Sequence, residues 1–130
     1  MDQQKKQTTD HDKLVREWFQ TKNVEVTLSV PVKIGKIKKG SFYAVFSDIY
    51  LYLFEVIDDR DVNLLEKHPW EDFEHVMMNP SWFKLRVMLD QTVDLSFSKN
   101  QDRVMNFLTK KQELKTWEFE RNWWSRMLGK

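Results

Sequence analysis

The sequence predicts an α+β fold in which an antiparallel sheet lies between a short N-terminal helix and a long C-terminal helix. Residues 24–34 alternate apolar and polar side chains, which is the period of a strand with one buried face. Residues 84–97 repeat this alternation on both sides of Asp90-Gln91, as a hairpin does. From residue 98 to residue 128, neither proline nor glycine interrupts a run of helix-forming residues.

The composition is typical of one intracellular domain. With 130 residues, of which 41% are hydrophobic, the chain can bury a core without disulfides. Its net charge of +1 does not indicate nucleic-acid binding, and it has no cysteine for thiolate catalysis or a thiolate metal site. No apolar run approaches the roughly 18 residues of a membrane span. We therefore expect a cytoplasmic protein, with peripheral contact at the inner face of the membrane as an alternative.

The first elements are predicted to be a tail, a helix and a strand. Residues 1–8 are polar without periodicity, which predicts a disordered tail, and a helix is predicted over residues 9–22. The apolar stripe of this helix contains Leu14, Val15, Trp18 and Phe19. Pro31 lies within the strand that follows and cannot donate to a ladder, so the strand must lie at an edge or bend there.

The middle of the chain is predicted to form the centre of the sheet. Residues 42–46 and 49–57 are apolar on both faces, with a tight turn between them, which indicates two central strands. Residues 58–63 have the composition of a loop. Residues 69–76 fit either a helical turn or a short strand.

Four segments of the chain carry a family resemblance: the run SFYAVFSDIYLYLFEV, the motif WEDFEHV, the hairpin FKLRVMLDQTVDLSFS and the helix start NQDRVMNFL. In their order and spacing they resemble the pleckstrin-homology-like superfold, nearest to its GRAM and bacterial pleckstrin-homology branches. The resemblance covers about residues 24–109. It implies a bent antiparallel barrel or sandwich with a C-terminal helix at one end, and hence a single domain over residues 9–130.

A basic turn follows the first strand. It contains Lys33, Lys36, Lys38 and Lys39, with no acidic residue. Gly35 and Gly40 in the same turn would let backbone amides approach an anion, which makes the turn a candidate anion- or lipid-binding site. The alternative, which we favour, is a solvated turn whose lysines protect the edge of a hairpin.

The resemblance does not carry lipid specificity over to this chain. Phosphoinositide binders of the family have a lysine near the end of the first strand and an arginine in the second. Here the turn supplies lysines, but Phe42, Ala44 and Phe46 occupy the second strand.

The C-terminal helix is predicted to carry two apolar faces. One face should lie over the sheet and contains Val104, Phe107, Leu108 and Leu114. The second lies in an extension over about residues 110–128 and contains Trp117, Phe119, Trp123, Trp124 and Met127. A straight helix cannot place both on one small domain. Either the helix bends near residues 109–115, or the second face meets another surface: the N-terminal helix, another copy, another protein or a membrane.

Catalysis has no support in the sequence. His11, His68 and His75 lack the spacing of metal ligands, and no acid, base and nucleophile converge on a motif. We therefore expect no enzyme activity, metal or cofactor. The leading hypothesis is self-association or protein binding through the helical extensions. The alternative is an anionic membrane surface bound through the lysine turn, and nucleic acid ranks third.

Overall fold

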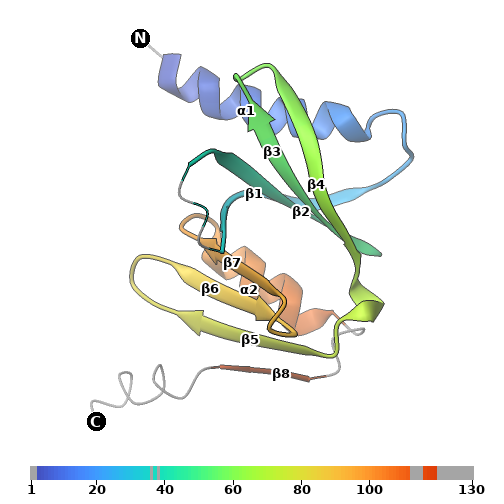
Figure 1. Cartoon of the computed structure of the whole chain (residues 1–130), viewed down its shortest axis with the longest axis vertical. Coiled ribbons are helices and arrows are strands. Elements are labelled where there is room, and N and C mark those ends of the chain that lie inside the picture. The colour runs from blue at the N-terminus through green and yellow to red at the C-terminus, as the bar shows by residue number, and fades with distance from the viewer. Residues whose placement is uncertain (1–2, 36, 38, 112–115, 120–130) are drawn as a thin grey trace.

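The computed structural model describes residues 3–35, 37, 39–111 and 116–119. In these residues it contains two α-helices and a sheet with the strand order β4-β3-β2-β1-β7-β6-β5-β8 (Figure 1). The helices are α1 (Gln3–Phe19) and α2 (Gln101–Lys110). The strands are β1 (Val26–Ile34), β2 (Ser41–Ser47), β3 (Tyr50–Ile57), β4 (Asp61–Pro69), β5 (His75–Pro80), β6 (Leu85–Leu89), β7 (Val93–Phe97) and β8 (Thr116–Phe119).

Two antiparallel meanders make up most of the sheet, and β1 joins them. Strands β1 to β4 pair in sequence order, and so do β5 to β7. The end of β1 also pairs with β7, through Lys33 with Ser96 and Ile34 with Leu95. Pro31 pairs with β2 just before this second pairing begins, so it lies where β1 has one neighbour. This position satisfies the constraint that proline imposes on the strand.

The main core lies between the two meanders and is closed by α2. Trp70 is fully buried at its centre, where its ring stacks on that of Phe46 with centroids 5.8 Å apart. The indole nitrogen of Trp70 donates a hydrogen bond of 2.8 Å to the carbonyl oxygen of Ser47, so the buried polar group is satisfied. Val104 and Leu108 of α2 are buried against this core, as predicted, whereas Leu114 lies outside the described residues.

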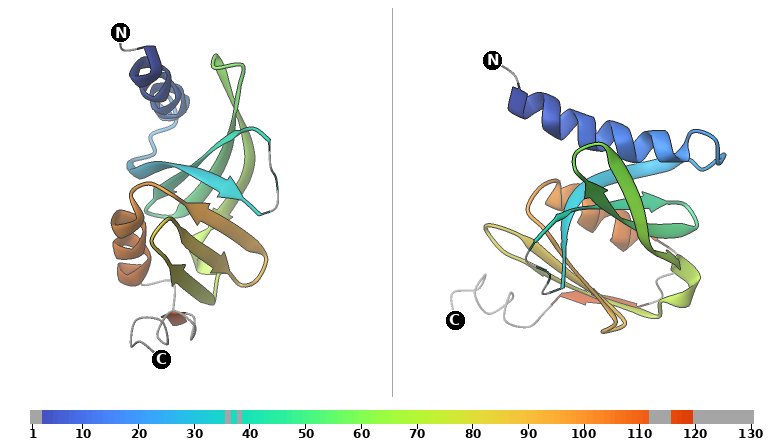
Figure 2. Two further views of the ribbon diagram at one scale, coloured as in Figure 1. Left: turned by 90° about the vertical axis from the view of Figure 1, so that its left-hand side faces the viewer. Right: turned by 45° about the horizontal axis from the view of Figure 1, so that its top comes forward.

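A second core forms where α1 covers the other face of the first meander (Figure 2). Phe19 is 4% exposed, and its ring meets those of Tyr52 and Phe54 edge-on at 4.8 and 5.6 Å. Every residue of β2 except Ser41 is buried, and β3 is buried over most of its length. The prediction that these two strands are central, with both faces apolar, is therefore confirmed.

The first helix is longer at its start than the sequence predicted. It begins at Gln3, within the segment expected to be a disordered tail over residues 1–8, and it ends at Phe19 instead of residue 22. Glutamine and lysine are good helix formers, and a helix that is already docked on a sheet can extend through them. Asn23, with φ of 52°, lies in the turn that follows.

The prediction of a C-terminal helix over residues 110–128 is wrong for residues 116–119, which the structure describes as a strand. Helix α2 ends at Lys110, and Thr116–Phe119 form β8, which pairs in parallel with β5. Threonine, tryptophan and phenylalanine favour strands, and the edge of β5 offers them hydrogen bonds that a helix pattern cannot reveal. In Figure 1 β8 lies at the opposite end of the molecule from α1.

Two further segments differ from or complete the predictions. The expected loop over residues 58–63 is a turn over residues 58–60 followed by β4, because β3 offers its edge for antiparallel pairing along the whole of that strand. Residues 69–76 contain both of the alternatives, a short 3₁₀ turn over Trp70–Asp72 and the start of β5. The predicted hairpin over residues 84–97 is confirmed as β6 and β7.

Docking of α1 should contribute strongly to stability through Phe19. We expect Phe19→Ala to lower the free energy of unfolding by about 3–5 kcal/mol, because it removes a buried ring and leaves a cavity against β3. Urea unfolding monitored by circular dichroism measures the change. Glu17→Ala, an exposed position on the same helix, should change it by less than about 0.5 kcal/mol. Equal stability of Phe19→Ala and the wild type would contradict the second core.

Candidate anion-binding groove

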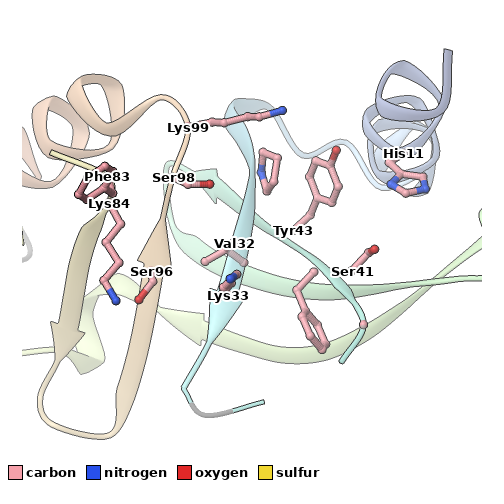
Figure 3. A pocket seen from close by; sticks show the side chains of 13 residues that line it. His11, Val32, Lys33, Ser41, Tyr43, Phe83, Lys84, Ser96, Ser98 and Lys99 are labelled. Carbon is pink, nitrogen blue, oxygen red and sulfur yellow. The ribbon is translucent and has the colours of Figure 1, made fainter. Parts of the chain in front are cut away.

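A groove of about 550 Å³ opens on the outer face of the sheet where β1 passes from β2 to β7 (Figure 3). Pro31, Val32 and Lys33 of β1 lie along it. One side is formed by the start of β2 and by His11 of α1, and the other by residues around β6, β7 and the start of α2. The groove thus exists because the two neighbours of β1 diverge.

Three lysines bring positive charge to the groove from three separate segments. Lys33 lies at the end of β1, Lys84 precedes β6 and Lys99 precedes α2. All three are exposed, and within the described part of the chain none of them forms a salt bridge. No aspartate or glutamate is among the lining residues. Charge of one sign in a concave site concentrates the local potential and attracts anions.

Asp94, one of the acids near the groove, is neutralised by a local partner. Asp94 of β7 receives two hydrogen bonds from the guanidinium of Arg86, at 3.0 and 2.9 Å. A bidentate pair of this kind compensates the charge of the carboxylate. The Asp94 carboxylate in β7 therefore reduces the positive potential of the groove lysines less than an unpaired carboxylate would.

Hydroxyl groups stand between the lysines. Ser96 pairs with Lys33 on one side and with Arg86 on the other, so it lies in a row of cationic side chains across three strands. Ser41 and Ser98 also line the groove, from the start of β2 and the end of β7. Hydroxyls can donate hydrogen bonds to the oxygens of a phosphate that lysines attract.

Helix α1 supplies one wall of the groove through His11. The ring of His11 meets that of Tyr43 edge-on, with centroids 6.3 Å apart. Its Nε2 atom lies 2.5 Å from a carboxylate oxygen of Asp59 in the β3–β4 turn, which ties the helix to the sheet. Burial raises the pKa of the Tyr43 phenol, and the negative charge of Asp12 raises it further. The hydroxyl of Tyr43 therefore stays protonated and remains a hydrogen-bond donor at neutral pH.

The two glycines of the basic turn have different roles from those expected. The backbone N–H of Gly35 donates to the carbonyl oxygen of Asp94 at 2.7 Å, so it is already used within the fold. Gly40 has φ of +112°, and a Cβ atom there would lie 3.0 Å from the ring of Phe42. Glycine at this position lets the chain enter β2 beside that ring. The Gly35 amide is thus paired within the sheet, and anion binding by the basic turn stays a prediction.

The predicted site residues divide into three groups. Lys33 lines the groove, and Lys39 is exposed in the turn but is not among the lining residues. Trp117 and Phe119 lie in β8, where the structure describes the backbone. The remaining predicted residues lie outside the described residues: Lys36, Lys38, Trp123, Trp124 and Met127.

Sequence reasoning missed Lys84 and Lys99, which share the groove with Lys33. They lie 51 and 66 positions further along the chain, and only the pairing of β1 with β7 brings them near it. The sequence contained only a weak indication that these residues share a site. Lys84 and Ser96 occupy polar positions in the alternation of the predicted hairpin, which places them on its outer face but does not identify a ligand.

The described residues contain no group of three or more histidine, aspartate and glutamate side chains that could hold a metal ion. None of the helices in the described residues is both long enough and apolar enough to cross a membrane.

Comparison with known proteins reveals likeness in architecture. No protein-family model matches the chain, and no curated protein matches it. The hSac2 domain of the human phosphoinositide phosphatase Sac2 is similar over 84% of this chain and 85% of that chain, with 11% identity and a TM-score of 0.51. Two crystal structures of the linker-DH/PH domains of p115-RhoGEF, one of them N-terminally truncated, are similar over 65% and 76% of this chain, with identities of 11% and 13% and TM-scores of 0.45 and 0.47. The chain spans 27% and 32% of the length of those two chains.

The arrangement of the elements supports the class of fold that the sequence resembles. Two antiparallel meanders joined through β1, with a helix directly after β7, are consistent with the pleckstrin-homology-like fold. The likeness to the Sac2 domain, at 11% identity, supports the fold alone. This chain adds α1 and β8 to that arrangement.

Burial of Tyr43 predicts a loss of stability at alkaline pH. Since the folded state raises the pKa of this phenol above 10.0, its contribution is complete below that pH and is lost as the pH rises through the raised value. We expect Tyr43→Phe to flatten the fall in unfolding free energy between about pH 9 and about pH 12, measured by urea unfolding. Tyr52, whose pKa is also raised by burial, should account for the remaining slope. An unchanged slope in Tyr43→Phe would contradict this assignment.

Proposed function

We propose that this chain is a non-enzymatic binding module that holds a phosphate-bearing anion in the basic groove. The presence of Lys33, Lys84 and Lys99 in a groove whose lining includes no acid is the observation that carries the proposal. Within the pleckstrin-homology-like class we place the chain nearest to the GRAM and bacterial branches, on the order of its apolar segments. The ligand proposal does not depend on that placement.

The chemistry of the groove favours phosphate over other anions. Lysine ammonium groups are compact point charges that approach a phosphate from several directions, whereas planar carboxylates are better matched by arginine. No arginine is among the lining residues, and Arg86 of the nearby strand β6 is engaged with Asp94. A phosphate would also accept hydrogen bonds from the serine hydroxyls that lie between the lysines.

The size of the groove favours a phosphate carried on an organic body. Its volume of about 550 Å³ is in the range of sites for small organic molecules and is much larger than an inorganic phosphate needs. Pro31, Val32, Phe42 and Phe83 contribute apolar surface to the lining. A sugar- or inositol-like body could cover this surface while its phosphate meets the lysines.

Reversal of the three groove charges should abolish binding. We expect the triple variant Lys33→Glu, Lys84→Glu and Lys99→Glu to bind a soluble inositol polyphosphate more than about 100-fold more weakly in isothermal titration calorimetry. The reason is that each lysine near an anionic ligand is worth roughly 1 kcal/mol, or about fivefold. Wild-type affinity should also fall as salt is added.

A variant with the same change in net charge serves as the control. Lys13, Lys67 and Lys110 are exposed and lie outside the groove, so their replacement by glutamate should reduce affinity far less. Urea unfolding establishes that both variants are folded. A folded groove variant that binds as tightly as wild type would refute the proposed function.

A second candidate function is self-association through β8. This strand ends the described sheet, pairs with β5 on one edge, and presents its other edge without a strand partner among the described residues. Exposed edges of this kind pair with other chains. The strand contains Trp117 and Phe119, which the sequence predicted as interface residues.

Light scattering after size exclusion tests the second candidate. If β8 edges pair between copies, the mass should rise toward twice 15.9 kDa as protein concentration increases. Trp117→Ala with Phe119→Ala should then restore the monomer mass, because the side chains that pack across the new edge are lost. A mass of one chain at every concentration would contradict self-association and would leave the groove proposal unaffected.

A further inference from the structure

The loop between β5 and β6 presents two adjacent aromatic side chains to solvent. Trp82 is 96% exposed and Phe83 is 84% exposed, more than any other large hydrophobic residue described. Single exposed apolar residues are common on protein surfaces, but two large neighbouring rings in water indicate a contact surface. We call this pair the aromatic tip.

The backbone holds the aromatic tip in a defined position. Ser81 and Lys84 flank it and form three hydrogen bonds with each other. The backbone N–H and the hydroxyl of Ser81 each donate to the carbonyl oxygen of Lys84 at 2.9 Å, and the N–H of Lys84 donates to the Ser81 hydroxyl at 3.3 Å. The loop is thus closed directly above the last β5–β6 pair, Pro80 with Leu85. A preorganised loop loses little conformational entropy when its tip is buried by a partner.

The aromatic tip is continuous with the basic groove. Phe83 and Lys84 line the groove, and Figure 3 shows them on the same side as Ser96 and Lys99. Apolar rings beside lysines, with no acid in the lining, complement an anionic bilayer. Aromatic rings enter the boundary between headgroups and acyl chains, while lysines meet the lipid phosphates.

The position of Trp82 separates two possible sources of the phosphate, a lipid headgroup and a soluble compound. It is not among the lining residues of the groove, so a small phosphate compound bound there would leave it in water. A bilayer that supplies the phosphate from a headgroup would also bury the neighbouring tip. A lipid surface would therefore bury Trp82, whereas a diffusing ligand in the groove would leave it exposed.

We infer that Trp82 and Phe83 form a membrane-insertion tip that enters an anionic bilayer while the groove holds a lipid phosphate. This inference rests on the proposed function and specifies the source of its ligand. The lysines attract the surface, and the tip adds a short-range apolar contact that persists when salt screens the charges.

Co-sedimentation of the full chain with vesicles tests the tip. We expect binding to phosphatidylcholine vesicles that contain phosphatidylserine, and little binding to phosphatidylcholine alone. Trp82→Ala with Phe83→Ala should weaken binding to the anionic vesicles at least about tenfold, because two rings no longer leave water. Ile49→Ala, which removes a side chain that is 59% exposed in the β2–β3 turn, should bind as wild type does. Unchanged binding of the double variant would overturn the inference.

Depth-dependent quenching locates the tip directly. Lipids brominated on their acyl chains should quench tryptophan fluorescence of the wild type more than that of Trp82→Phe, which keeps an apolar ring but lacks the indole. Equal quenching of the two proteins would show that Trp82 stays outside the bilayer and would overturn the inference. A dimer that Trp82→Ala with Phe83→Ala dissociates, without vesicle binding, would do the same by identifying a second copy as the occupant.

The binding experiments distinguish an error in the proposed tip from an error in the proposed groove. Trp82→Ala should retain wild-type affinity for the soluble inositol polyphosphate, because Trp82 does not line the groove. Loss of vesicle binding in the triple lysine variant alone, with the tip variants unaffected, would support the groove and refute the tip. Retention of inositol polyphosphate binding by that triple variant would refute the proposed function itself.

Discussion

The pairing of β1 with two different strands is the constraint on which the rest of the structure depends. It hydrogen-bonds to β2 over most of its length and to β7 at Lys33 and Ile34. On the inner side this joins the two meanders around one core, with Trp70 at its centre and α2 closing it. On the outer side the divergence of β2 from β7 leaves the groove. The stability of the fold and the candidate site therefore have one geometric cause.

Helix α1 explains why the chain is so rich in aromatic residues. A sheet in this class needs one apolar face, but here β2 and β3 are buried on both faces, so they need large side chains on both. Trp18 and Phe19 of the helix pack against Tyr52 and Phe54, edge-on. The same docking brings His11 to the groove and to Asp59, so an element that stabilises the sheet also shapes the site.

Features that depend on local periodicity could be predicted from the sequence, and features that depend on distant pairing could not. The alternation over residues 84–97 and the apolar phases of β2 and β3 belong to single strands, and the structure has them as expected. The prediction of a helical C-terminal extension failed because residues 116–119 fit both a helix pattern and a strand. The choice between the two depends on pairing with β5, which begins 41 residues earlier in the chain. The groove could not be predicted for the same reason. Of its three lysines, one lies in the predicted basic turn, and the other two come from distant segments of the chain.

Phe83 shows how a turn can override a strand pattern at the proposed membrane-insertion tip. It shares the odd-numbered phase of Leu85, Val87 and Leu89, which are all buried, and so periodicity alone would place its ring in the core. The hydrogen bonds between Ser81 and Lys84 keep Phe83 in the turn, and β6 begins at Leu85, two residues later. The ring is left in water beside the lysines of the groove. A core position would stabilise the isolated domain by the burial of a phenyl ring, roughly 1.5–3 kcal/mol. In its exposed position the ring contributes none of this stabilisation to the free molecule. A partner that buried the aromatic tip would remove the ring from water and gain that free energy on binding.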